Sequence, residues 1–164
     1  MEKITAVVLA AGAGKRMHSQ YMMLAGRPVL FYALQAFAES AVTDIVVVVG
    51  AGEIDYCRKE IVEKYHIQKV CAVVEGGRER YHSVYEGLKA ADGSDYVLIH
   101  DGARPLVTTD IISRSIACVR EGDSCVVGMP VKDTIKVVGA DGFAKETPKR
   151  SSLWQIQTPQ TFPY

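Results

Sequence analysis

The sequence predicts an α/β fold built on a mostly parallel sheet with helices packed on both faces. Two observations lead to this prediction. Short runs of β-branched and apolar residues recur along the chain, without the polar alternation of a half-exposed strand. Between these runs lie segments with the 3.6-residue apolar spacing of a helix. Such an alternation indicates parallel strands joined by right-handed crossovers.

Five segments are expected to form the strands of this sheet. Each is rich in β-branched or other apolar residues on both faces, which is typical of a strand that helices cover from both sides. In chain order they are residues 4–9, 45–49, 70–74, 96–100 and 124–129.

Four segments between and after these strands are expected to be helices. Pro28 suits the first helical position of one, and Thr108 or Thr109 suits the N-cap of another. The apolar positions expected to face the core are Leu30, Ala33, Leu34 and Phe37, then Ile54, Cys57, Ile61 and Tyr65, then Tyr81, Val84, Tyr85 and Leu88, and finally Ile112, Ile116 and Val119.

The pattern changes after residue 130. Residues 133–147 alternate β-prone residues around a Gly-Ala-Asp-Gly turn, which predicts a hairpin. Two interpretations are open: an edge hairpin folded onto its own sheet, or an arm that reaches a partner subunit, since a two-stranded hairpin has little stability alone. We expect residues 1–164 to form one domain that includes this segment, at about 131–150.

Composition and charge exclude several classes of protein. The 19 Lys and Arg balance 19 Asp and Glu, so nothing favours a nucleic-acid partner. No apolar run is long enough to span a membrane and the N-terminus has no signal-peptide layout, so no membrane partner and a cytoplasmic location are expected. The four cysteines lack a C-x-x-C spacing, and we expect buried, reduced thiols.

Glycine-containing or polar loops follow four of the predicted strands. They read "AAGAGKRM", "EGGRER", "HDGARP" and "MPVKDT". Because the carboxyl ends of parallel strands meet at one edge of the sheet, where open α/β sheets bind ligands, these loops should converge on one site.

The first of these loops matches neither the Walker A motif nor G-x-G-x-x-G. It does offer the exposed N–H groups of the small residues 10–14, followed by Lys15 and Arg16, to an anion. A triphosphate fits that description. The alternative is a tight turn between strand and helix with two solvated cations.

The second and third loops add a helix and a carboxylate to this edge. If the tyrosines of the third helix face the core, Ser83 lies on the opposite side and could bond a base edge, with Gly76 and Gly77 letting backbone approach. The alternative is an ordinary exposed serine. Asp101 is a candidate Mg²⁺ ligand, and the alternative is a turn held by an Asp101–Arg104 pair. His100 is interpreted as a core histidine.

Five ordered motifs give the chain a close resemblance to a known family. The segments "LAAGAGKRM", "GGRERYHSV", "HDGARPLV", "PVKDTIK" and "SSLWQIQTPQTF" resemble those of the 2-C-methyl-D-erythritol 4-phosphate cytidylyltransferases. The resemblance implies a Rossmann-like three-layer sandwich with a protruding β-hairpin arm. It also implies that CTP and methylerythritol phosphate react in isoprenoid biosynthesis to give 4-diphosphocytidyl-2-C-methyl-D-erythritol and pyrophosphate, in a homodimer interlocked through the arm.

The resemblance also implies a set of site residues. The nucleotide-binding positions are Ala10, Ala11, Gly12, Gly76, Gly77 and Ser83, to which the loop analysis adds Gly14 and Lys15. The catalytic positions are Arg16 and Arg150, and Asp101 matches the magnesium-linked aspartate. Thr134, Arg150 and Thr158 match positions that hold methylerythritol phosphate, Arg150 in the neighbouring subunit's site.

Two departures from the family pattern stand out. Family members continue for several tens of residues beyond Tyr164, and they carry a lysine directly before Gln20, where this chain has Ser19. We therefore expect a lysine-containing stretch to be missing between Met17 and Gln20. The alternatives left open are a ribitol-5-phosphate cytidylyltransferase, another sugar-phosphate nucleotidyltransferase, and a nucleotide-binding module without catalysis.

Overall fold

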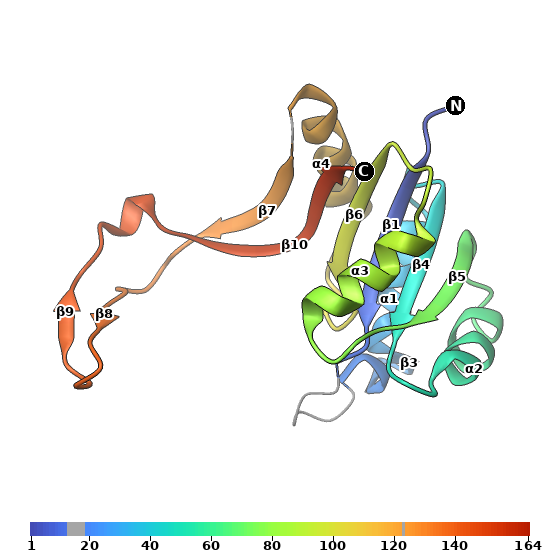
Figure 1. Ribbon diagram of the computed structural model, residues 1–164, viewed down its shortest axis with the longest axis horizontal. Helices are drawn as coiled ribbons and strands as arrows, with labels where there is room; N and C mark the ends of the chain where they lie inside the picture. Colours follow the sequence, from blue (N-terminus) through green and yellow to red (C-terminus); the bar gives the residue numbers. More distant parts are fainter. Residues whose placement is uncertain (13–18, 123) are drawn as a thin grey trace.

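A six-stranded sheet forms the centre of the protein in the computed structural model, which describes residues 1–12, 19–122 and 124–164. Its strand order is β5-β4-β1-β6-β10-β7 (Figure 1). The strands are β1 (Ile4–Ala10), β4 (Asp44–Val49), β5 (Val70–Glu75), β6 (Tyr96–Asp101), β7 (Cys125–Pro130) and β10 (Trp154–Pro163).

The directions of these strands confirm a mostly parallel sheet. β1 pairs in parallel with β4 and β6, and β4 pairs in parallel with β5. β10 is antiparallel to both of its neighbours, β6 and β7, so β7 points the same way as the parallel strands. All five predicted strands are present, but β7 lies at the sheet edge with Val126 and Met129 exposed, rather than buried as predicted.

The sixth strand, β10, was not predicted. Gln155, Gln157 and Gln160, together with Pro159, interrupt any apolar run in this segment. The strand nevertheless forms because it lies between β6 and β7 and pairs with both, with an irregularity between Ile156 and Gln160. Pairing with distant segments therefore overrides a weak local pattern here.

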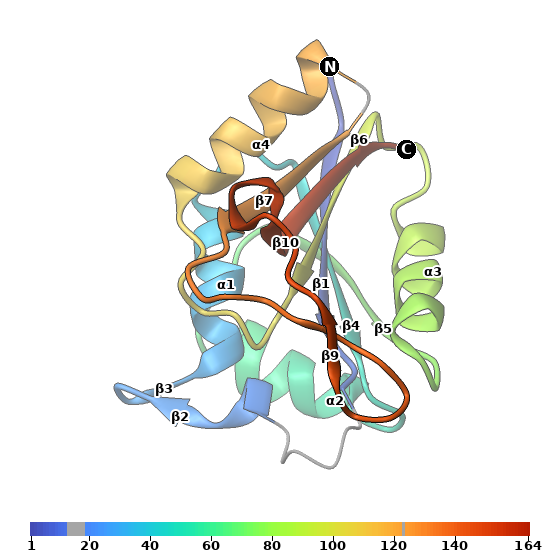
Figure 2. The ribbon, with the colours of Figure 1, turned by 90° about the vertical axis from the view of Figure 1, so that its left-hand side faces the viewer.

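Helices cover both faces of the sheet and give the predicted Rossmann-like three-layer sandwich (Figure 2). The helices α1 (Val29–Ala38) and α4 (Thr109–Glu121) lie on one face, and α3 (Arg80–Ala90) lies on the other. A short α2 (Ile54–Tyr56) continues into a π-helix over Cys57–Glu63, whose Cys57 and Ile61 join the same apolar core as α1 and α4.

The predicted inner faces of α1 and α4 are confirmed. Their buried side chains include Leu30, Ala33, Leu34, Phe37, Ile112, Ile116 and Val119. Pro28 is the N-cap of α1, one residue before the expected position. Thr108 is the N-cap of α4, and its hydroxyl accepts a hydrogen bond from the Ile111 N–H at 3.2 Å.

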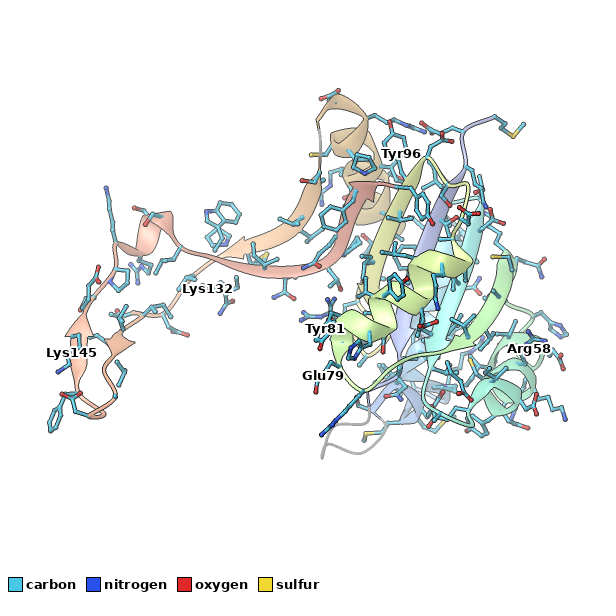
Figure 3. The ribbon with its side chains drawn as sticks, in the orientation of Figure 1. Arg58, Glu79, Tyr81, Tyr96, Lys132 and Lys145 are labelled. Carbon is cyan, nitrogen blue, oxygen red and sulfur yellow. The ribbon has the colours of Figure 1, made fainter. Side chains whose placement is uncertain are left out.

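The predicted inner face of α3 is right for Val84 and Leu88, which pack against the apolar cluster on this side of the sheet, but it is wrong for the two tyrosines. Tyr81 and Tyr85 are 68% and 61% exposed, whereas Ser83 and Gly87 are buried (Figure 3, where Tyr81 is labelled). A Cβ atom on Gly87 would overlap Val7 and come within 2.9 Å of Val48 Cγ2. The helix axis thus lies so close to β1 and β4 that only small side chains fit beneath it, and the tyrosines are left outside.

The hairpin segment extends away from the sheet as an arm (Figure 1). Its two short strands, β8 (Val137–Val138) and β9 (Ala144–Glu146), pair antiparallel. Gly142 allows the turn between them because its φ is +80°, in the left-handed region. The arm does not fold back on its own sheet, and apart from half-buried Gly139 every side chain from 132 to 147 is exposed.

The remaining elements are short. They are a 3₁₀ turn at Ser19–Tyr21, the strand pair β2 (Met23–Leu24) and β3 (Arg27–Pro28), and a 3₁₀ turn at Arg150–Ser152. The cysteines are unpaired as predicted, but only Cys57 is fully buried and Cys71 and Cys118 are exposed. In the described part of the chain, no helix combines the length and apolar character needed to cross a membrane.

Candidate active site

The carboxyl ends of the parallel strands bring three of the predicted loops together. Ala10 ends β1 beside Val49 of β4, and Val49 in turn lies beside Glu75 at the end of β5. On the other side of β1, Leu9 lies beside Asp101 at the end of β6. The segments 11–12, 76–77 and 101–104 therefore leave the sheet side by side, as the parallel topology requires.

A cavity of about 470 Å³ opens between these segments. It is lined by Leu9, Ala11, Gly12, Gly77, Arg78, Glu79, Arg80, Ser83, Asp101 and Ala103. Five of the residues predicted for the nucleotide or the metal thus share one cavity, of a size that suits a small ligand. Ala10 is buried at the strand end just below, and Gly76 directly precedes Gly77.

Glycine at position 76 makes this close convergence possible. A Cβ atom there would overlap the Ser83 hydroxyl and lie 2.7 Å from the Ala11 Cβ. The N–H of Gly77 donates to Ser83 Oγ at 3.2 Å. Ser83 is therefore not the exposed serine of the alternative interpretation: it is buried and ties the start of α3 to the glycine pair.

Asp101 forms ion pairs with two arginines at the site. Its Oδ1 accepts from Arg80 Nη2 at 3.0 Å, and its Oδ2 accepts from Arg104 Nε at 3.0 Å. Burial alone would raise the pKa of Asp101, but the hydrogen bonds and charges of Arg80 and then Arg104 hold that pKa below its ordinary value. The carboxylate is therefore ionised at neutral pH and lies between two cations.

The turn held by an Asp101–Arg104 pair, which was the alternative to a metal ligand, is present. It does not remove Asp101 from the cavity, because the carboxylate remains about 30% exposed. Sequence reasoning missed Arg80 and gave it no role. The available signal was its position in the first turn of a helix that follows two glycines.

His100 and Thr158 lie directly behind Asp101. His100 is buried, and its ring nitrogens contact the Arg104 carbonyl at 3.1 Å and Thr158 Oγ1 at 3.0 Å. The Asp101 N–H donates to the same Thr158 hydroxyl at 3.3 Å. Burial lowers the pKa of His100 to about 4, although the Arg104 carbonyl and the Asp101 charge act in the opposite direction. His100 is thus neutral and bonded to backbone, as a core histidine should be.

A second cavity of about 510 Å³ lies next to this group, on the side of the arm. Its lining is largely apolar and includes Leu106, Val127 and Met129. Its polar members are His100, Arg104, Gln157 and Thr158. Arg104 Nη1 donates to Gln157 Oε1, so the turn after β6 is joined to β10 at this point.

The arm residues do not reach either cavity in a single chain. Thr134 and Arg150 are exposed, and Arg150 Nη1 donates to the Lys132 carbonyl at 3.0 Å. Figure 3 labels Lys132 and Lys145, which lie on the extended arm away from the sheet. Gly14, Lys15 and Arg16 lie outside the described residues, as does most of the stretch between Met17 and Gln20 where a lysine was expected, so these predictions stay predictions.

The fold and the cavity define an α/β protein with a ligand site at the carboxyl edge of its sheet, lined by glycine backbone and by charged side chains. The family of 2-C-methyl-D-erythritol 4-phosphate cytidylyltransferases matches residues 4–164. The chain belongs to this family, and the resemblance seen in its motifs is confirmed.

Individual relatives agree with this assignment. A 2-C-methyl-D-erythritol 4-phosphate cytidylyltransferase of Lachnoclostridium phytofermentans is 54% identical over 168 aligned positions, which cover 100% of this chain and 72% of the relative. One from Alkaliphilus oremlandii is 47% identical over 170 positions, with the same coverage. The crystal structure of a 4-diphosphocytidyl-2C-methyl-D-erythritol synthase from Anaerococcus prevotii superposes with a TM-score of 0.86 at 34% identity, covering 99% of this chain and 70% of that one.

Proposed function

We propose that this chain is a cytidylyltransferase that joins CTP and 2-C-methyl-D-erythritol 4-phosphate in the isoprenoid pathway. A phosphate oxygen of methylerythritol phosphate attacks the α-phosphorus of CTP, the bond from that phosphorus to the bridging oxygen breaks, and pyrophosphate leaves. Family membership supports the reaction. The single structural observation that carries the proposal is the cavity that unites Ala11, Gly12, Gly77 and Ser83 with Asp101.

The first two walls of the cavity are the proposed nucleotide site. The N–H groups of residues 10–12 face the phosphates, and Lys15 and Arg16 next along the chain supply positive charge. Gly76, Gly77 and Ser83 surround the cytosine. Because the attacking phosphate is already an anion at neutral pH, the reaction needs alignment and charge neutralisation rather than a general base.

Mg²⁺ is the proposed metal, with Asp101 as its protein ligand. The described residues contain no group of three or more potential ligands that would form a complete cage. A single ionised carboxylate beside a nucleotide site still fits Mg²⁺, which commonly binds one or two carboxylates together with substrate phosphates. The ion would offset the charge of the triphosphate. Arg80 and Arg104 hold the carboxylate in place at the cavity wall.

The arm is the proposed contact between two copies of the chain. Its exposed apolar side chains include Val137, Val138 and Phe143, of which Phe143 is 73% exposed. Burying them against a second copy would explain why so open a hairpin is stable. In such a homodimer, Thr134 and Arg150 of one chain approach the site of the other, and Thr158 lines it from β10. Because both substrates are charged and dissolved in water, we expect the reaction to occur in the cytoplasm.

Pyrophosphate release tests this function directly. We expect release with CTP, methylerythritol phosphate and Mg²⁺, and little with ATP, with ribitol 5-phosphate or with a hexose 1-phosphate. Faster release with ribitol 5-phosphate would instead support the related cytidylyltransferase, and no release with any acceptor would support a binding module. In a thermal-shift assay CTP should stabilise the protein more than ATP or GTP does.

Two variants test the site assignments. Asp101→Asn should lower kcat at least about 100-fold, because it removes a charge from the reacting centre. The matched control is Asp110→Asn, since Asp110 is an exposed carboxylate paired with Arg114 on α4. Gly76→Ala should weaken CTP binding, because the added methyl group overlaps Ser83 and crowds Ala11.

Mixed dimers test the role of the arm. If Arg150 acts in the partner's site, mixing Asp101→Asn with Arg150→Ala chains creates one intact site in each mixed dimer. About a quarter of wild-type activity should then return in an equal, statistically paired mixture. No recovery, or a monomer at all concentrations by light scattering, would contradict the proposed arrangement.

A further inference from the structure

Behind Asp101, a series of hydrogen bonds joins the end of β6 and the turn that follows it to β10. His100 is fully buried on β6, and its ring packs edge-on against Phe37 at 5.2 Å between centroids. One ring nitrogen, Nε2, contacts the Arg104 carbonyl, and the other, Nδ1, contacts Thr158 Oγ1 on β10. Both partners belong to segments that border the cavities of the site.

The donor and the acceptor of each of these hydrogen bonds follow from the two backbone groups at either end of the series. A carbonyl oxygen only accepts hydrogen bonds, so Nε2 of His100 must carry the ring proton and donate to Arg104. The neutral ring then has a free lone pair on Nδ1, which accepts from the Thr158 hydroxyl. The backbone N–H of Asp101 only donates, and it donates to the oxygen of that same hydroxyl.

The arrangement uses the whole hydrogen-bonding capacity of the histidine ring. It also commits the single hydroxyl proton of Thr158, which is only 8% exposed, to His100. Thr158 consequently has no proton left to donate to a ligand. Its remaining polar contact is the bond from the Asp101 N–H.

We propose that His100 and Thr158 are positioning residues for the transfer reaction. Together they fix the backbone of Asp101 at one end of the turn and the carbonyl of Arg104 at the other. The turn 101–104 presents the Asp101 carboxylate to the glycine-lined cavity and Arg104 to the neighbouring apolar one, with the two side chains bonded to each other. This inference rests on the proposed function and changes the role of Thr158, which acts through Asp101 rather than by donating to the substrate.

The test uses paired variants of the full chain. Thr158→Val removes the hydroxyl but keeps the shape of the side chain, and Thr158→Ser keeps the hydroxyl. His100→Phe removes both ring bonds, and His100→Gln keeps an N–H that can still donate to the Arg104 carbonyl. Each variant is first compared with the wild type by its denaturation midpoint, and Thr158→Val decides the case if His100→Phe does not fold.

Kinetics separate a positioning role from a purely structural one. Misplacing the turn should lower kcat of Thr158→Val about 10- to 100-fold, because small displacements of reacting groups have effects of that size. The KM for CTP should change less than about threefold, because the glycine-lined part of the site is untouched. Thr158→Ser and His100→Gln should recover much of the loss. An unchanged kcat in a folded Thr158→Val would overturn the inference.

Two readouts do not depend on turnover. In a ¹⁵N spectrum of histidine-labelled protein, the signals lost in His100→Gln should report a protonated Nε2 and an unprotonated Nδ1, and a protonated Nδ1 would overturn the inference. In the presence of CTP, Mn²⁺ affinity by electron paramagnetic resonance should fall about tenfold in Thr158→Val, as for other residues that orient a metal ligand. Unchanged affinity would contradict a role at Asp101. If the wild type lacks transferase activity but both readouts are as expected, the proposed function is wrong, whereas the hydrogen bonds among His100, Thr158 and Asp101 are confirmed.

Discussion

The body of the protein, which is the sheet with its covering helices, and the arm differ in how much of their side-chain surface is buried. The central strands β1, β4 and β6 consist almost entirely of fully buried side chains, and helices seal both faces. Between 132 and 147 the arm has no buried side chain, and a short two-stranded ladder is its only regular structure. The body therefore carries its own hydrophobic stabilisation, whereas the arm gains none from the described residues, and this contrast supports the proposed contact with a second copy.

This contrast also separates the two halves of the proposed site. Every described residue proposed for the nucleotide or the metal lies on the body, where packed strands fix its position. Thr134 and Arg150 lie on the arm, where no contact among the described residues of the chain fixes them to the cavity. We therefore expect the body to bind a nucleotide without a partner, and the proposed acceptor half of the site to depend on the proposed dimer.

The largest expected effect comes from a matched pair of phenylalanines. Phe37→Ala should lower the free energy of unfolding by about 3–5 kcal/mol, because it leaves a cavity in the core. Phe143→Ala on the arm should change it by less than about 0.5 kcal/mol in dilute protein. Urea unfolding followed by circular dichroism measures both. If both variants lose the same free energy of unfolding at low protein concentration, the contrast between body and arm is wrong. A loss in Phe143→Ala that grows with protein concentration would support the proposed dimer.

A smaller effect is expected where α3 lies against the sheet. Gly87→Ala should lower the free energy of unfolding by about 1–3 kcal/mol, because the new methyl group overlaps Val7 and Val48 and forces the helix outward. Gly122→Ala is the control, since a Cβ there meets only the Cys118 carbonyl oxygen, at 3.7 Å. If denaturant unfolding shows no difference between the two, the close packing of α3 is wrong.

The buried thiol of Cys57 makes the body sensitive to alkaline pH. Burial, followed by the charge of Glu53, raises the pKa of Cys57 from 9.0 to about 12. Above pH 9 the unfolded chain releases this proton and the folded chain keeps it, so stability should fall as pH rises from 9 towards 12. At one and a half units above pH 9 the loss is about 2 kcal/mol.

Unfolding at pH 8 and pH 10.5 measures this dependence, and Cys57→Ala is its control. The pKa of Tyr21 is raised first by burial and next by the charge of Cys57, so the difference between the two proteins measures the thiol together with its effect on Tyr21. The arm contains no cysteine, so its removal should leave the slope unchanged. Identical slopes for wild type and Cys57→Ala would contradict a sealed thiol.

The smallest effect on the body is expected from the turn of the arm. Gly142→Ala places a Cβ at a φ of +80°, which costs about 1–2 kcal/mol in the hairpin alone. The Gly139 N–H, which donates to the Phe143 carbonyl at 2.9 Å, should exchange faster with solvent, while amides of β1 and the global midpoint stay unchanged. Ala140→Ser is the control. A lower global midpoint in Gly142→Ala would show that arm and body unfold together.

Much of the candidate site was predictable because it sits where strands end. Ala10, Gly12, Gly77 and Asp101 each follow or end an apolar run that the sequence displays plainly, and parallel topology then brings them together. The partners of Asp101 were harder to find. Nothing in the local pattern paired Arg80 with Asp101, because a spacing pattern cannot reveal how closely a helix approaches a sheet or which of its residues then meets a neighbouring loop.

The sequence by itself determined the βαβ order of the body, the inner faces of α1 and α4, and the loops that meet at the carboxyl edge. It could do so because the buried face of a helix or strand appears in the sequence as apolar residues at a regular spacing. Tertiary structure alone decided the insertion of β10, the close approach of α3 and the bonded group of His100, Thr158 and Asp101. These depend on atoms that are brought together from distant parts of the chain, and no local pattern encodes such contacts.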